Sequence, residues 1–419
     1  MRSWKAVTLT SGTKAYWIIG AMISTVITAR LLGPHGRGVI AAAMSWVTMF
    51  STFGHLSLAN VIVYLLGRQE RDRNLPAVAG SVMAITAATT LLGWTIVLLM
   101  DVFSGGRIFQ NIPAAALVVA FAGLPLLLWM ENGNSLLIVL GDLKRVNLAQ
   151  FAGTTTTIVL VLIAVGVLRL GVVGALGATV VSYAILDGIA LTRVLRMSGR
   201  PSISREVVRE LLGGGIRLHV AAVGTFLFTQ AGVILLNQFR PVAEAGFFQL
   251  AMQMTAATQV VPMAVAIVAY SLVARHGPEA AWREHRSLVL QTMLYAALAA
   301  AVSYFAAPWI VPLLAGRGFE PAVPILRILT LSVFGMSVAT VMAPQWVARG
   351  YFLHVAALAV VAGAISLIGN FLFIPRYGMY ACAWAMVASY AIYLAGNVAF
   401  GCWIERRRRE APALEPVRG

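Results

Sequence analysis

The segment GVVGALGATVVSYAI, residues 171–185, occurs again in altered form as GMYACAWAMVASYAI at residues 378–392. The two segments align without a gap and share seven of fifteen residues at an offset of 207 positions. At the same offset, Pro34 in the segment ARLLGPHGRGVI (residues 29–40) corresponds to Pro241, and Gly141 lies close to that offset from Gly350. Small residues inflate identity in membrane helices, yet matches near the start, middle and end of each half indicate an internal repeat.

The composition around these segments is that of a membrane protein. Of 419 residues, 60% are hydrophobic and only 11% are charged, whereas a soluble domain carries about 25% charged residues. The net charge of +16 would suggest nucleic acid in a soluble protein. Here the basic residues gather between apolar runs, which indicates orientation in a membrane, and we expect no nucleic-acid partner.

Twelve apolar runs approach or exceed the roughly 20 residues that a membrane-spanning helix needs. With six runs in each half, both halves enter the membrane from the same side, so the repeats are parallel, as in many transporters. We therefore predict an all-α integral membrane protein with a six-helix lobe at 1–194, a cytoplasmic basic linker at 195–211, a second six-helix lobe at 212–404 and a basic tail at 405–419. The predicted runs are 10–32, 38–66, 77–101, 112–140, 147–168, 171–194, 212–238, 245–274, 288–315, 321–347, 351–374 and 378–403.

The distribution of Lys and Arg predicts the orientation. With the N-terminus inside, 23 of the 31 basic residues lie at the inner side and 8 at the outer side. Because cytoplasmic connections carry the excess of Lys and Arg, both termini should be cytoplasmic, in a bacterial or archaeal inner membrane. The segment at residues 29–40 is then an outward-facing reversal at Gly33, Pro34 and Gly36, and we expect its His35 and Arg37 to be solvated.

This architecture, the segment ARLLGPHGRG between the first two runs, and LLGGGIRLHVAAVGTFLF at the start of the second half resemble the polysaccharide transporters of the multidrug/oligosaccharidyl-lipid/polysaccharide flippase superfamily. The resemblance covers essentially the whole chain. It implies a V-shaped, two-lobe transporter with an alternately exposed central cavity. The implied function is to flip a polyprenyl-pyrophosphate-linked oligosaccharide to the outer leaflet for surface polysaccharide synthesis, with membrane lipids and polysaccharide polymerase machinery as partners.

Basic residues near the ends of the first helix of each half are candidates for binding a pyrophosphate. Lys14 and Arg217 lie near the cytoplasmic starts of the first and seventh runs, at nearly equivalent places in the repeat, and Arg30 lies at the outer end of the first run. Each could make charge-assisted contacts with the anion, or could extend to the lipid headgroups. Both interpretations stay open.

Carboxylates and amides within the apolar runs are the second group of candidates. Burial of a carboxylate within a membrane costs free energy, and such groups rarely face lipid. Glu131 and Asp187 could therefore each relay a proton or sodium ion, or form a charge pair with an arginine of the other lobe. Gln249 and Gln253 lie one helical turn apart, with Gln259 further along. Such a stripe can bind sugar hydroxyls or hold helices together.

Two other functions remain to be weighed. A cation-coupled exporter of small molecules or drugs would be expected to have a first lobe rich in carboxylates, and the absence of Asp and Glu from the first two runs counts against it. A membrane enzyme that polymerises or ligates glycans needs catalytic groups outside the membrane, but every external connection here is short. No phosphate-binding loop, metal-binding motif or catalytic residue is recognised, so we expect a transporter that is not an enzyme and has no cofactor or metal.

Overall fold

The computed structural model describes residues 2–66 and 71–410, and the side chains within them from residue 12 onward except 71–74, 217–218 and 408–410. All regular elements in these ranges are helical, and they contain no strand. The first half comprises α1 (Arg2–Gly54), α2 (Leu58–Leu66), α3 (Arg71–Ser104), η1 (Arg107–Phe109), α4 (Ala114–Ala122), α5 (Leu124–Val139), α6 (Leu143–Val161), η2 (Leu162–Val167) and α7 (Gly171–Ser198). The second comprises α8 (Arg205–Thr229), α9 (Ala231–Phe239), α10 (Val242–Ala257), α11 (Val260–Ala280), α12 (Trp282–Ala315), η3 (Arg317–Phe319), α13 (Ala322–Leu329), α14 (Ser332–Ala348), α15 (Phe352–Tyr377) and α16 (Met379–Glu410).

Within the described residues, nine helices are long and apolar enough to cross a membrane. The number rises to eleven if two bent helix pairs, one in α8 and one formed by α13 and α14, are each counted as one span. The chain is therefore a multi-pass membrane protein. The sequence predicted twelve spans. The lower number arises partly because α1 is counted as one span although it contains two helices.

Gly33 divides α1 into two arms. Its φ of 67° and ψ of −175° are non-helical, and only glycine adopts such a conformation without steric cost. Pro34 follows in the first turn of the second arm, where its missing N–H and fixed φ favour a helix start. The predicted break in the segment at residues 29–40 is confirmed.

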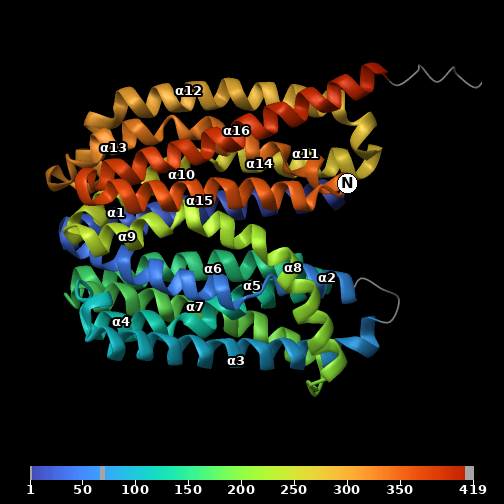
Figure 1. Cartoon of the computed structure of the whole chain (residues 1–419). Helices are drawn as coiled ribbons and strands as arrows, with labels where there is room; N and C mark the ends of the chain where they lie inside the picture. Colours follow the sequence, from blue (N-terminus) through green and yellow to red (C-terminus); the bar gives the residue numbers. More distant parts are fainter. Residues whose placement is uncertain (1, 67–70, 411–419) are drawn as a thin grey trace, which may run out of the picture.

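The helices form two parts, with α3 to α7 at the bottom of Figure 1 and α10 to α16 at the top. The connections predicted to lie outside gather at one end of the molecule. A Cβ on Gly36 would lie 3.5 Å from the Val172 side chain, and one on Gly318 would lie 3.8 Å from Pro34. We call this the hairpin end, and the opposite end, where the N-terminus lies, the N-terminal end.

Corresponding elements recur in the two halves. The helices α3 and α12 both have 34 residues, and each leads into a short 3-10 turn that follows a glycine, in the sequences GRIF (106–109) and GRGF (316–319). Gly171 and Gly378, which begin the two matched segments, have similar positive φ angles of 62° and 55°. The similarity of the two segments therefore extends to backbone conformation.

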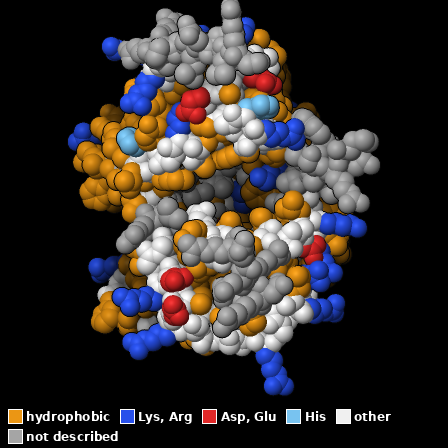
Figure 2. All heavy atoms as spheres, turned by 90° about the vertical axis from the view of Figure 1, so that its right-hand side faces the viewer, with side chains coloured by type: hydrophobic (Ala, Val, Ile, Leu, Met, Phe, Trp, Pro, Cys, Tyr) orange, Lys and Arg blue, Asp and Glu red, His pale blue; other side chains and the backbone are white. Residues whose placement is uncertain are grey.

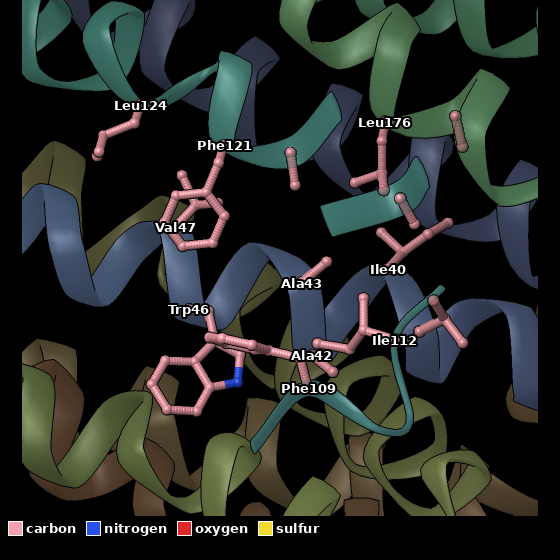
Figure 3. Packing of buried hydrophobic residues seen from close by; sticks show 14 of the residues in the cluster. Ile40, Ala42, Ala43, Trp46, Val47, Phe109, Ile112, Phe121, Leu124 and Leu176 are labelled. Atoms are coloured by element: carbon pink, nitrogen blue, oxygen red, sulfur yellow. The ribbon is translucent and has the colours of Figure 1, made fainter. Parts of the chain in front are cut away.

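The main apolar core joins the first half to the start of the second. Figure 3 shows Trp46 beside Phe109 and Val47 beside Phe121, and the Trp46 and Phe109 rings meet edge to face with centroids 5.2 Å apart. Val242 of α10 belongs to the same cluster. The second arm of α1 is thereby held between the two parts of the molecule.

Candidate functional site

A cavity of about 450 Å³ lies between α1, α5, α6 and α7, and α10 of the other half also contributes to its wall. Both arms of α1 face it. Its lining residues are Trp17, Gly20, Ala21, Ser24, Thr25, Arg37, Ile40, Met44, Met130, Glu131, Asn134, Val146, Gln150, Gly153, Thr154, Thr157, Thr179, Tyr183, Leu186 and Gln253. The lining therefore combines one guanidinium, one carboxyl, several amides and hydroxyls, and aromatic rings.

Arg37 is the cation of this cavity. Its side chain is on the second arm of α1 and only 8% of the residue is exposed. One terminal guanidinium nitrogen (Nη2) donates to the Thr25 hydroxyl at 3.3 Å, and the Nε–H has no hydrogen-bond partner among the described residues. The expectation of a solvated Arg37 is wrong, whereas His35 is exposed as expected. A buried cation with unused donors is suited to binding an anion.

The polar lining arises from helical spacing. On α6, Val146, Gln150, Gly153 and Thr157 follow one another at intervals of three or four residues, which places them on one face. Glu131 and Asn134 have the same spacing on α5. The ion pairs found among the described residues do not include Arg37 with Glu131, so the guanidinium and the carboxyl group both line the cavity without a direct ion pair.

The structure brings together only some of the predicted site residues. Glu131 and Gln253 line the cavity. Lys14 is half-buried and lies three residues, just under one helical turn, before the lining residue Trp17. The side chain of Arg217 lies outside the described residues. Gln249 is not in the lining, and its buried side-chain oxygen has no hydrogen-bond partner in the described structure.

Asp187 lies next to the cavity, not in its lining. Its neighbour Leu186 and Tyr183, one turn earlier on α7, both line the cavity. Asp187 is only 4% exposed, and neither carboxyl oxygen has a hydrogen-bond partner among the described residues. An ionised carboxylate without partners costs several kcal/mol in such surroundings, so this group is expected to hold a proton or a cation.

Arg30 joins the two halves at the hairpin end. Its guanidinium donates to the main-chain carbonyls of Leu313 (from Nη2) and Leu314 (from Nε, at 2.7 Å), in the last turn of α12. Since the C-terminus of a helix carries partial negative charge, this contact is favourable. In this conformation Arg30 therefore binds the opposite half and not the cavity.

Further contacts close the hairpin end. The Asn111 amide donates to the Asn237 carbonyl at 2.7 Å, and the Gln238 amide donates to the Ile108 carbonyl. At the N-terminal end, by contrast, Figure 2 shows a hollow between the upper and lower parts of the molecule with Lys or Arg side chains inside it. The two parts thus meet at one end and separate at the other.

The sequence analysis missed Arg37, Gln150, Asn134 and Tyr183 as site residues. A signal for Arg37 was present, because Arg37, Ile40 and Met44 are spaced by three and four residues and form one face if a helix begins at Pro34. The signal for the threonines of α6 was weaker, since hydroxyl side chains in membrane helices commonly bond to the preceding turn, as Thr154 does to the Gln150 carbonyl at 2.8 Å.

The bundle of apolar helices, open at one end around a polar cavity, defines a multi-pass membrane transporter. The model of a family described as "Polysaccharide biosynthesis protein" matches residues 3–273. The chain belongs to this family. No curated protein matches the sequence significantly.

Solved structures of similar fold are transporters and a flippase. The structure of the lipid II flippase MurJ in an inward closed conformation has 12% identity and a TM-score of 0.73, covering 96% of this chain and 91% of that one. An inward-facing multidrug resistance transporter of the MATE family has 17% identity and a TM-score of 0.65, covering 96% and 95%. A transporter from Pyrococcus furiosus, described as having a binding pocket of reverse polarity, has 16% identity and a TM-score of 0.58, covering 97% and 96%. The chain therefore has the fold of the superfamily to which these transporters belong.

Proposed function

We propose that this protein flips a polyprenyl-pyrophosphate-linked oligosaccharide from the inner to the outer leaflet during surface polysaccharide synthesis. Family membership supports the pathway. The observation that carries the proposal is the buried guanidinium of Arg37, with an unused Nε–H, in a cavity walled by amides and hydroxyls. A polysaccharide polymerase would be the partner that receives the flipped product.

The chemistry of the lining suits the two parts of this cargo. Arg37 can donate to the pyrophosphate, and charge-assisted hydrogen bonds to such anions are short and strong. Gln150, Gln253 and Asn134 each offer both donors and acceptors to sugar hydroxyls. Lys14, near the open end, would attract the pyrophosphate toward the cavity, and Arg217 occupies a nearly equivalent place in the second half.

We further propose twelve membrane spans in two parallel six-helix lobes, with both termini in the cytoplasm of a bacterial or archaeal cell. The repeated order of α3, η1 and α4–α5 in the first half and α12, η3 and α13–α14 in the second supports the two lobes. The excess of basic residues at the N-terminal end supports the orientation. With this orientation the structure corresponds to an inward-open state, closed at the hairpin end.

Glu131 and Asp187 are our candidates for coupling transport to a proton or sodium gradient. Glu131 faces the cavity and Asp187 lies behind its wall on α7. Both could change occupancy when the cavity is exposed to the other side of the membrane, because hydration then changes the cost of the ionised form.

Substitution of Arg37 tests the proposal. In a flippase-deficient strain, Arg37→Gln should lower surface polysaccharide by roughly tenfold to a hundredfold, because a hydrogen bond to a charged group contributes about 1.5–3 kcal/mol. Arg37→Lys should retain part of the activity, since it keeps the charge and loses the planar donor pair. Membrane abundance of each variant is the control. Complementation by Arg37→Gln at the wild-type level would overturn the assignment of the site.

A cation-coupled drug exporter is the second candidate, and Glu131 in the cavity lining favours it. An exporter of cations should tolerate Arg37→Gln or gain activity from it, because its cargo has the opposite charge. It should depend strongly on Glu131. A wild-type chain that failed to restore polysaccharide and instead gave resistance to cationic drugs, lost in Glu131→Gln, would establish this alternative.

A further inference from the structure

A second pocket, of about 580 Å³, lies in the second half of the chain and shares no residue with the cavity described above. It is formed where α11 and α14 end, where α12 and α15 begin and where α16 approaches its end. Its lining residues are Pro278, Glu279, Trp282, Ala348, Arg349, Tyr351, Trp403, Ile404 and Arg407. Five candidate spans, one of them a bent pair, begin or end at residues of this lining or directly beside it, so we expect the pocket to lie at the depth of the lipid headgroups.

A chain of buried hydrogen bonds fixes the guanidinium of Arg349 in this pocket. His285, which is fully buried, donates from Nε2 to the Val341 carbonyl at 2.8 Å. Its Nδ1 therefore accepts from the amide of Gln345 at 2.9 Å, and the Gln345 oxygen in turn accepts from Arg349. The Arg349 side chain is only 8% exposed. These contacts hold a buried cation in the second pocket, and this cation is not part of the transport cavity.

The charges around the pocket favour an anion. The Arg407 guanidinium lies over the Trp403 ring, 4.5 Å from its centroid. The one carboxylate in the described lining is Glu279, whose side chain is 78% exposed and whose Oε1 lies 3.6 Å from Arg349 Nε. That contact is long and solvated, so an incoming phosphate can displace it at little cost.

An apolar groove continues from the pocket. It has a volume of about 360 Å³ and is lined by Trp346, Tyr351, His354, Gly396, Ala399, Phe400 and Trp403. Tyr351 and Trp403 belong to both spaces. Trp346 and Phe400 stack with centroids 3.6 Å apart, so this side of the groove is aromatic. A polar compartment with two cations thus opens into an apolar compartment beside it.

We propose that this composite site binds an anionic glycerophospholipid of the surrounding leaflet. The headgroup phosphate lies between Arg349 and Arg407, and an acyl chain lies along Trp346 and Phe400. Basic pockets between membrane helices are suited to such headgroups, and the adjoining groove distinguishes a lipid from free phosphate. The site is separate from the transport cavity, so the bound lipid is a structural partner of the second half and not the transported cargo.

Native mass spectrometry of the purified full-length protein tests this site. Delipidated protein is titrated with dioleoyl phosphatidylglycerol, with dioleoyl phosphatidylcholine, and with soluble glycerol 3-phosphate. We expect phosphatidylglycerol to bind at least about tenfold more tightly than either of the others. Arg407→Gln, which changes an exposed side chain, and Arg349→Lys, which keeps the charge, should each weaken that binding. Glu279→Gln should strengthen it, because it removes the competing carboxylate.

Arg283→Gln is the matched control, since Arg283 is exposed at the start of α12 and lies outside the lining. It removes the same charge from the same end of the molecule and should leave phosphatidylglycerol binding within about twofold of the wild type. An equal loss in Arg283→Gln and Arg407→Gln would mean general attraction to basic helix ends and would overturn the proposal. Equal binding of phosphatidylcholine, or of glycerol 3-phosphate, would also overturn it.

Discussion

Arg37 and Asp187 are two buried ionisable residues of the first half, and the structure gives each fewer partners than its chemistry requires. Arg37 has a single described hydrogen bond, to Thr25, and Asp187 has none at either carboxyl oxygen among the described residues. Such groups lower stability, because burial removes hydration that protein contacts do not replace. Their presence is explained if transport uses the charge of the first and the exchangeable proton or cation of the second.

Replacement of Asp187 by asparagine separates these functional and structural roles. Asp187→Asn keeps the size of the side chain and removes the exchangeable group. We expect unchanged membrane abundance, an equal or higher thermal midpoint, and a loss of at least about tenfold in gradient-driven transport. The measurement is uptake into proteoliposomes under an imposed proton or sodium gradient. Full gradient-driven transport by Asp187→Asn would exclude the residue from coupling.

At the scale of the helices, α1 and α10 pack unusually closely at the hairpin end. A Cβ on Gly38 would overlap the Val242 carbonyl oxygen, and one on Gly246 would overlap the Pro34 carbonyl oxygen. The two glycines are related by almost the same offset as the sequence repeat, so each half contributes one glycine to the contact. Close approach of the two backbones thus depends on the absence of both side chains.

Gly38→Val should therefore disfavour the closed hairpin end. Overpacking of this kind costs about 1–3 kcal/mol. It would shift the equilibrium between the closed and the open hairpin end toward the open form by roughly fivefold to a hundredfold. Spin labels on the exposed residues Gln110 and Glu320, one from each half, should report longer distances in a Cys402→Ser background, where the remaining Cys382 is buried. Gly188→Val is the control, because a Cβ there has no atom within 4 Å. Unchanged distances in Gly38→Val would show that the contact does not hold the end closed.

At the scale of the whole molecule, the connections between the helices gather at the two ends of the molecule. The Ser202 amide donates to the Pro76 carbonyl at 3.0 Å, which places the linker between the halves beside the start of α3. At the other end, the Asn111 amide donates to the Asn237 carbonyl. These contacts group the connections by end, and the distribution of basic residues then predicts which end faces the cytoplasm.

Reporter fusions test that orientation. Fusions near Gly105, Arg169, Pro241 and Gly318 should be active only with a reporter that works outside, and fusions near Arg71, Ser202 and His276 only with a cytoplasmic one. A reversed result at two or more sites would reject the orientation and the assignment of the open end to the cytoplasm. Expression level of each fusion is the control.

The sequence predicted the break at Gly33 and Pro34 because both residues act through local backbone geometry. It did not predict the burial of Arg37, because the direction of that side chain depends on the residue at which the next helix starts. A helix starting at Gly38 would have left Arg37 in a loop. The break between α1 and α2 was also missed, since Leu56 and Ser57 adopt positive φ angles of 49° and 51° that only tertiary contacts can impose.

The hydrogen bonds that close the hairpin end have a feature in common: their acceptors are main-chain carbonyls. Arg30 binds those of Leu313 and Leu314, Asn111 binds that of Asn237, and Gln238 binds that of Ile108. Such acceptors persist whatever side chain a position carries. Substitution at the accepting positions therefore leaves these hydrogen bonds intact, and the closure depends on the donor side chains of Arg30, Asn111 and Gln238 alone.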